Sequence, residues 1–438
     1  MKSNLTSLLM VVLGLLPTVL IGVPVSAADS RTTETLTLEQ YFAAALKRSE
    51  VVANQTELIR QAEERYNQSN SSLLPTVNGV ATYTWQDPQP AGELDSSVSP
   101  NRQRLVKITA TQPLFRGFRE FAGLRQNKAL LGAQNEDYLV ARTQLFKDVA
   151  QNFYNVLSIE QDLKNLDEEI SQDSAREKEL NDRMRIGRSR VGETLTIQSA
   201  ISTLRAQIEQ LRGQLNATRE AFAFLSGLDA ATPLRDTEIL PATMEPVDAY
   251  LARLELRPDV KASKQRLAAT QENISVVKGA HLPSLDLNAN RYLERSGNQK
   301  DVAWDVQLAL TIPIFTGGLT QSKVREATSL NTQAELSVSQ ISRQAEQEIR
   351  SLYQSVLFDQ YQLEALERAT DAAKKNYQAQ LRDYRLGLVT NLDVLQALTT
   401  FQENQRALDR ARFSTKLDYL KLQAAAVRRP ALPDGSTP

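Results

Sequence analysis

The residue types that carry most enzyme and metal chemistry are scarce in this chain of 438 residues, which has no Cys and a single His, His281. Thiol nucleophiles, iron–sulfur clusters and zinc fingers are therefore excluded. His281 stands before Leu282-Pro283 with no second His or Cys to join it, so we expect no metal site. No nucleophile elbow, phosphate loop or metal-ligand spacing occurs either. We predict no catalytic residue and no cofactor.

Two short turns are marked by the same motif, Arg185-Ile186-Gly187 and Arg385-Leu386-Gly387. Glycine is favoured where a tight turn between helices needs a positive φ. A carboxylate follows each Gly by six residues, Glu193 in the first case and Asp393 in the second. If Thr390 or Asn391 caps the next helix, Asp393 merely favours the positive helix end. A structural and a functional role for these carboxylates both remain open at this point.

The motif belongs to a longer duplication, because residues 113 to about 210 recur 200 positions later without insertion or deletion. Pro113-Leu114-Phe115-Arg116-Gly117 matches Pro313-Ile314-Phe315-Thr316-Gly317. Upstream parts correspond at a slightly larger offset, as in Leu74-Pro75 and Leu282-Pro283. Two copies of one structural unit are expected where a closed, quasi-symmetric object is built.

The segments 119–186 and 319–386 contain no Pro and almost no Gly, and their apolar residues recur every seven positions. This period indicates helices that supercoil left-handedly around their neighbours. At 1.5 Å per residue each helix would be about 100 Å long. An ordinary coiled coil would explain these two segments on their own.

Four other segments alternate with period two, namely 76–85, 105–112, 284–290 and 302–312. Each has about the length of a tilted transmembrane strand. In this interpretation Trp85 and Trp304 meet lipid. The residues predicted to line a wet lumen are Asp286, Asn288, Asn290, Asp305 and Gln307.

Strands in a membrane must close into a barrel, since an open edge leaves backbone groups unpaired in hydrocarbon. Four strands are too few, because spanning barrels start near eight. The chain must then oligomerise and share its barrel, with eight strands from two copies or twelve from three. The alternative is a soluble β-sandwich or a pair of edge hairpins.

The N-terminal residues 1–27 have the pattern of a secretory signal, with Lys2, an apolar stretch over 8–21 and the small-residue site Val25-Ser26-Ala27. A retained anchor helix is the alternative. Beyond this segment no apolar run approaches the ~20 residues of a membrane-spanning helix. Lys and Arg (51) nearly balance Asp and Glu (52), so no nucleic-acid partner is indicated.

The order helix, hairpin and long helices, followed by the same again, resembles the TolC-type outer membrane factors. The Leu-Pro, Pro-[Leu/Ile]-Phe-x-Gly and Tyr384-Arg-Leu-Gly387 motifs fit, as does Asp393-Val-Leu. The resemblance implies a mainly α homotrimer, in which a shared twelve-stranded β-barrel in the outer membrane joins a helical tube in the periplasm. It also implies an exit duct that docks on a periplasmic adaptor and is driven by an inner-membrane RND, ABC or MFS transporter.

The duplication, the Pro and Gly content and the resemblance together suggest an arrangement along the chain. A linker and equatorial region is expected at 229–248, and a disordered tail at 428–438. The two structural repeats are expected at 28–228 and 249–427, with hairpins near 76–112 and 284–312 and long helices near 119–225 and 319–425.

Carried over by position, the resemblance makes Tyr384, Asp393 and Glu193 candidates for the gate at the periplasmic mouth. This chain departs from the best-known pattern, because Val389 stands where an arginine is expected and Gln396 where a second aspartate is expected. Other cations near the turns could replace that arginine. They are Arg188, Arg190 and Arg385. The turn motifs at 185–187 and 385–387 are the expected adaptor contacts.

Two classes of function remain in competition. The first is the export duct, which needs no catalytic residue. The second is a periplasmic coiled-coil adaptor or scaffold without a pore, whose four strands would be soluble. The cargo is not indicated, because the lumen residues do not distinguish drugs, metals, proteins and glycolipids.

Overall fold

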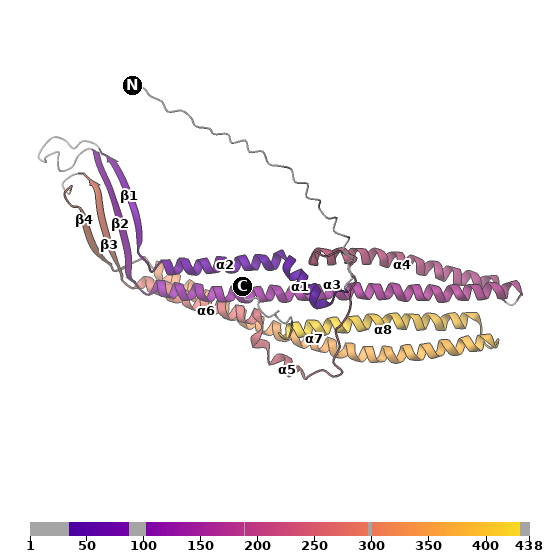
Figure 1. Cartoon of the computed structure of the whole chain (residues 1–438). Helices are drawn as coiled ribbons and strands as arrows, with labels where there is room; N and C mark the ends of the chain where they lie inside the picture. The colour runs from indigo at the N-terminus through magenta and orange to yellow at the C-terminus, as the bar shows by residue number, and fades with distance from the viewer. Residues whose placement is uncertain (1–34, 87–101, 188, 297–299, 430–438) are drawn as a thin grey trace, which may run out of the picture.

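The structure, a computed structural model, describes residues 35–86, 102–187, 189–296 and 300–429. It confirms the predicted order of helix, β-hairpin and two long helices, followed by the same order again (Figure 1). The predicted signal segment and most of the predicted tail lie outside the described residues. The elements are α1 Leu38–Arg48, α2 Glu50–Ser71, β1 Thr76–Trp85, β2 Arg102–Arg116, α3 Arg119–Arg185, α4 Val191–Ser226, α5 Val247–Leu251, η1 Leu254–Leu256, α6 Pro258–Lys278, η2 Gly279–His281, β3 Ser284–Arg295, β4 Trp304–Thr311, α7 Leu319–Arg385 and α8 Asn391–Ala425.

The four strands form one antiparallel sheet in the order β1-β2-β3-β4. The central β2–β3 pair joins the two halves of the chain, with Thr109 opposite Asn290. In the described part of the chain β1 and β4 each have a neighbour on one side only. The sheet therefore has two free edges, which offer unpaired backbone groups to further strands.

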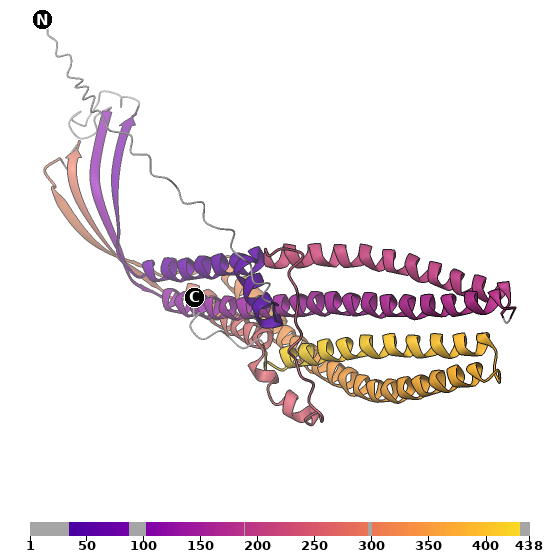
Figure 2. The same ribbon diagram turned by 45° about the vertical axis from the view of Figure 1, so that its right-hand side comes forward.

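Helices α3 and α7 have 67 residues each and are therefore about 100 Å long. Each turns back into a shorter antiparallel helix, α4 or α8. Both hairpins extend to the end of the molecule opposite the sheet (Figures 1 and 2). None of the helices in the described residues is both long and apolar enough to cross a membrane.

The main core lies where α1 packs on the middle of α3. Tyr41 is fully buried between Phe153 and Phe222, with ring centroids 6.5 and 4.5 Å away. Its hydroxyl donates to Asn152 Oδ1 at 2.9 Å, so the buried phenol is satisfied. In the second half Tyr250 is buried in a separate cluster with Ile349, Val356, Leu422 and Ala425.

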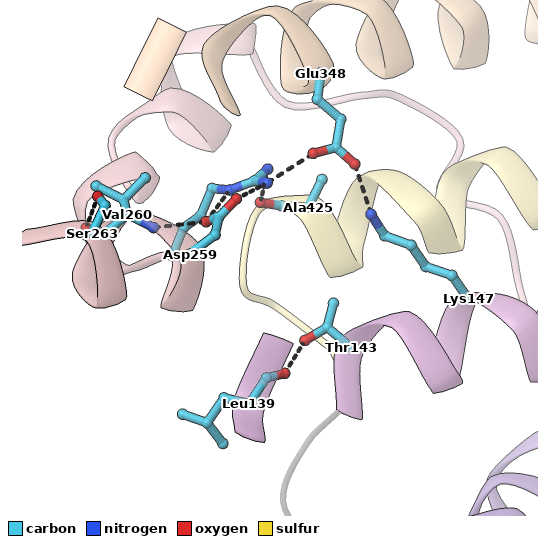
Figure 3. Close-up of polar contacts among 9 residues, drawn as sticks. Leu139, Thr143, Lys147, Asp259, Val260, Ser263, Glu348 and Ala425 are labelled. Carbon is cyan, nitrogen blue, oxygen red and sulfur yellow. Dashed lines mark hydrogen bonds and ion pairs between the residues drawn. The ribbon is translucent and has the colours of Figure 1, made fainter. Parts of the chain in front are cut away.

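A charged cluster joins the two halves of the chain (Figure 3). Glu348 of α7 accepts from Lys147 Nζ of α3 at 2.6 Å and from Arg257 Nη2 at 2.8 Å. Arg257 also donates to Asp259 and to the carbonyl of Ala425 near the end of α8. Burial opposes ionisation of Glu348, but its two cations outweigh burial and hold its pKa below the usual value. The cluster thus fixes α3, α6, α7 and α8 to one another.

Candidate functional site at the helix turns

Each helix hairpin ends in a turn with a left-handed glycine. Gly187 has φ 72° and Gly387 has φ 77°, as the turn interpretation requires. The apolar side chains beside them, Ile186 and Leu386, are 66% and 74% exposed. The residues predicted to contact an adaptor are therefore all exposed at the far end of the hairpins, namely Arg185, Ile186, Gly187, Arg385, Leu386 and Gly387.

Asp393 lies in a capping box at the start of α8. Its Oδ2 accepts from the backbone N–H of Thr390 at 2.8 Å and from the Thr390 hydroxyl at 2.6 Å. The Asp393 N–H donates to Thr390 Oγ1 at 3.4 Å. The hydrogen bonds from the hydroxyl and backbone of Thr390 hold the pKa of Asp393 below its usual value. Asp393 is therefore charged at neutral pH and orders the first turn of α8.

Glu193 has a different environment in the first turn. It accepts from Ser189 Oγ at 2.5 Å, and the N-cap residue Arg190 makes no side-chain cap bond. Among the described residues, neither Glu193 nor Asp393 forms an ion pair with Arg190 or Arg385. The third predicted cation, Arg188, lies outside the described residues. Of the two departures from the family pattern, Val389 is half-buried and Gln396 is exposed.

Tyr384, the third predicted gate residue, is buried between two arginines of α3 rather than beside a carboxylate. The guanidinium carbon of Arg176 lies 4.0 Å from the ring centroid, and that of Arg183 lies 4.5 Å from it. Both distances fit cation–π contacts, which are strongest where water is excluded. The tyrosine ring thus attaches the end of α7 to the end of α3.

Arg176 also reaches the start of α8. Its Nε and Nη2 both donate to Asn391 Oδ1, at 2.9 and 2.8 Å. Its Nη1 donates to Glu179 Oε2 at 2.7 Å, and the other oxygen of Glu179 accepts from Arg183. Arg176 and Asn391 are both buried, so loss of the two bonds to Asn391 would leave buried N–H donors of Arg176 without an acceptor. One guanidinium therefore connects the first hairpin to both helices of the second hairpin.

A series of polar contacts continues this connection along α3 and α8. The α3 side chains are spaced three and four residues apart, which is the spacing of one face of a supercoiled helix. The pairs are Asp162 with Arg410 at 2.7 Å, Asn165 with Asp409 at 2.9 Å, Glu169 with Arg406 at 2.9 Å and Gln172 with Gln402 at 3.4 Å. We call these four pairs, together with Arg176 and Asn391, the polar ladder.

A groove of about 650 Å³ lies beside the polar ladder, between α3, α4 and α8. Asp173 lines it and is only 3% exposed, and its Oδ1 has no hydrogen-bond partner. Burial raises the pKa of Asp173 to about 6. Burial likewise raises the pKa of Glu169, against the opposing effect of Arg406. We therefore expect this part of the connection between the hairpins to depend on pH.

The predicted lumen residues share one face of the sheet. Asn290 accepts from Lys107 and Thr109 and donates to Asp305 at 2.8 Å. Asn288 lies opposite Gln307, and Asp286 accepts from Arg116 at 2.9 Å. The opposite face presents exposed apolar side chains, which are Val77, Trp85, Ile108, Trp304, Val306, Leu308 and Leu310.

Arg176, Asn391 and the polar ladder were not predicted from the sequence. A signal for them exists, because Asp162, Asn165, Glu169, Gln172 and Arg176 form a polar stripe at heptad spacing on a helix whose other stripe is apolar. Such a stripe indicates a polar contact between helices. Within the described residues no group of three or more His, Cys, Asp or Glu side chains could hold a metal ion.

Comparison with known proteins agrees with the arrangement of long helices and a four-stranded sheet. The sequence profile of the outer membrane efflux protein family matches residues 42–228 and 250–426. Outer membrane protein TolC of Escherichia coli (strain K12) is 24% identical over 94% of this chain and 86% of its own length. The alkaline protease secretion protein AprF of Pseudomonas aeruginosa is 22% identical over 72% of this chain and 66% of its own length.

Solved structures share the fold. The outer membrane protein VceC of Vibrio cholerae superposes with a TM-score of 0.79 at 18% identity, over 89% of this chain and 95% of VceC. CusC superposes with a TM-score of 0.78 at 19% identity, over 89% of this chain and 91% of CusC. These matches confirm the predicted fold class of long helices joined to a four-strand share of a β-barrel. The chain therefore belongs to the outer membrane efflux protein family, and it is a non-enzymatic channel of the outer membrane whose helical hairpins extend into the periplasm.

Proposed function

We propose that three copies of this chain form one exit duct, which receives substrates from a periplasmic adaptor and an inner-membrane transporter of the RND, ABC or MFS type. Relatives named for efflux and for protease secretion both support the role of exit duct. Three copies would contribute twelve strands, a number that suits a water-filled barrel.

The observation that carries this proposal is the sheet. One face bears a hydrogen-bonded polar network and the other face bears exposed Trp, Val and Leu side chains. Among the residues that the structure describes, no further strand pairs with either edge of the sheet. A sheet of this kind satisfies its backbone in lipid only after it closes with further copies. The polar face, with Asp286, Asn288, Asn290, Asp305 and Gln307, would then line the lumen.

We further propose that the turns at Gly187 and Gly387 form the periplasmic mouth, with the exposed tips as adaptor contacts. The contacts of Tyr384 with Arg176 and Arg183 support a closed mouth, because they hold the second hairpin to the first. Asp393 would support the closed state through the capping box of α8, and Glu193 through Ser189. Arg185 and Arg385, which are exposed, would contribute positive charge to the tips.

Planar lipid bilayers provide the test. The purified protein should insert and produce discrete conductance steps, and variants that weaken the tip contacts should increase the step size. Absence of steps from a detergent-extracted, folded oligomer would contradict the role of duct. It would favour a periplasmic adaptor or scaffold.

A further inference from the structure

We propose that the groove between α3, α4 and α8 is a binding site for a small organic cation, one that carries an amidinium or guanidinium group on an apolar body. The three helices that line this groove belong to one chain, so the site goes beyond the role of duct and does not depend on the shared barrel. Three features of the groove support it, namely a buried carboxylate, an excess of negative charge, and a suitable size.

The buried carboxylate of Asp173 offers an acceptor without a donor. The side chain lines the groove and is only 3% exposed, and its Oδ1 accepts no hydrogen bond from the described residues. A carboxylate oxygen that is shielded from water and has no donor is unfavourable, and a donor that enters the groove removes this cost. Burial raises the pKa of Asp173, and a cation beside the carboxylate would lower it again.

The groove carries an excess of negative charge. The charged side chains that line it are three acids and one base, which leaves a net charge of −2 when all are ionised, and they are Glu169, Asp173, Glu403 and Arg406. Arg406 already donates to Glu169 at 2.9 Å. Arg176, one turn further along α3, donates to Asn391 and Glu179. A cation is therefore the class of ligand that the groove attracts.

The size of the groove suits an organic molecule better than a bare metal ion. Its volume of about 650 Å³ is within the range of small-molecule sites. In the part of the chain that the structure describes, no group of three or more His, Cys, Asp or Glu side chains could hold a metal ion. Leu195 of α4 and Leu395 of α8 also line the groove, so an apolar body would find apolar contacts there.

Hydroxyl groups of α4 add further acceptors to one wall. Thr196 Oγ1 donates to the Gly192 carbonyl oxygen at 2.9 Å, and Thr203 Oγ1 donates to the Ser199 carbonyl oxygen at 3.1 Å. Each hydroxyl has thereby used its proton, so its oxygen can only accept a further hydrogen bond. Acceptors on both α3 and α4 suit a planar group with several N–H donors, which is what an amidinium or guanidinium offers.

A bound cation would connect the two helical hairpins, because α4 belongs to the first hairpin and α8 to the second. A ligand that binds only the joined arrangement of the hairpins stabilises that arrangement. Binding should therefore also raise the Tm of the protein in detergent.

Isothermal titration calorimetry of the full-length protein in detergent tests the site, with benzamidine as the probe. The wild type should bind benzamidine saturably at pH 7.5, and Asp173→Asn should weaken binding by about tenfold or more. Ser199→Leu leaves every charge in place but fills the groove from α4, so it should weaken binding to a similar extent. The matched control is Asp167→Asn, because Asp167 also belongs to α3 but is exposed. Its affinity should equal that of the wild type.

The pH dependence of binding gives an independent readout. The pKa of Asp173 is about 6, so lowering the pH from 7.5 to 5 protonates most of this carboxylate and should weaken benzamidine binding by about tenfold. The α4 side chains that line the groove carry no ionisable group. The ionisable groups that face Asp173 from the other helices are Glu169 of α3, Glu403 and Arg406 of α8, and Tyr377 of α7.

Several results would overturn the cation site. They are the absence of saturable binding, equal affinities of the wild type and Asp173→Asn, an affinity that does not change with pH, and equal affinities for benzamidine and its neutral analogue benzamide. None of these results would contradict the role of duct, because conductance and oligomeric mass are measured without the probe.

Discussion

Arg176 and Tyr384 are 208 positions apart in the chain, yet the guanidinium carbon of Arg176 lies 4.0 Å from the centroid of the Tyr384 ring. The same arginine donates two hydrogen bonds to Asn391. Because Arg176 belongs to the first hairpin and the other two residues to the second, this contact ties the hairpins together beside their turns. The tips of the two hairpins can therefore separate only if this contact is broken.

Replacement of Arg176 by Ala should therefore raise the single-channel conductance in planar bilayers. A buried cation–π contact and charged hydrogen bonds together hold the tip by about 2 kcal/mol or more. Arg176→Lys keeps the charge but loses the planar two-point geometry, so it should produce an intermediate conductance. The matched control is Arg368→Ala, because Arg368 is exposed on α7 and, within the described ranges, its ion pair is with Glu364 one turn away. Equal conductance of Arg176→Ala and the control would remove Arg176 from the mouth.

Substitutions of Asp393 can distinguish two roles of this carboxylate, which are capping of α8 and supply of a negative charge to the pore. Asp393→Ala removes the acceptor of the capping box and should raise conductance by loosening the start of α8. Asp393→Asn removes the charge but keeps an acceptor oxygen, so its conductance should stay near that of the wild type. Thr390→Ala, which removes the other half of the box, should cost about 1 kcal/mol of stability and resemble Asp393→Ala. If Asp393→Asn raises conductance as much as Asp393→Ala, the charge of Asp393 and not its capping role keeps the mouth closed.

Asp173 should make the stability of the helical hairpins depend on pH. Its pKa is about 6 in the folded protein and 3.8 in the usual reference, so the folded state binds the proton more tightly. Stability therefore falls as the pH rises from about 4 to about 6 and is level above that. The groups around it are Glu169, Glu403, Arg406 and Tyr377.

Thermal unfolding in detergent between pH 4 and pH 8 measures this dependence. Asp173→Asn should raise the Tm above that of the wild type at pH 7.5, and the difference should shrink below pH 5. Asp371→Asn is the matched control, because Asp371 is exposed beside Lys375. A constant difference across the whole range would show that Asp173 does not titrate as its burial implies.

The contact between Gly117 and Gly279 should not tolerate a side chain. Gly279→Ala would place a Cβ 2.4 Å from a backbone oxygen, and overpacking of this kind costs about 1–3 kcal/mol. We expect a lower Tm and less protein in the outer membrane fraction. Gly213→Ala in α4 has nothing within 4 Å and should be neutral or stabilising. Equal yields and equal Tm values for the two variants would contradict a tight junction between the halves.

The long helices and the strands could be predicted from the sequence because their signals are local. Period seven over 119–186 and period two over 302–312 each depend on neighbouring residues only. The alternation also predicted which strand residues share a face, since Asn288 and Asn290 lie on one side of the sheet. Val80, which breaks the alternation, lies opposite Lys107 on the polar face.

The partners of the turn residues could not be predicted in this way. Tyr384 was identified through a family motif, but its contact with Arg176 depends on how the two hairpins, each with one 67-residue helix, twist together. Asn391 lies 215 positions from Arg176, and no local pattern relates them. The part that each residue plays at the mouth stays a prediction until conductance is measured.

The mass of the detergent-extracted protein, measured by light scattering after purification from the outer membrane fraction, tests the account most directly. If three copies form one shared β-barrel, the protein should give a single species with the mass of three chains. A folded monomer that remains in solution without detergent would contradict the account.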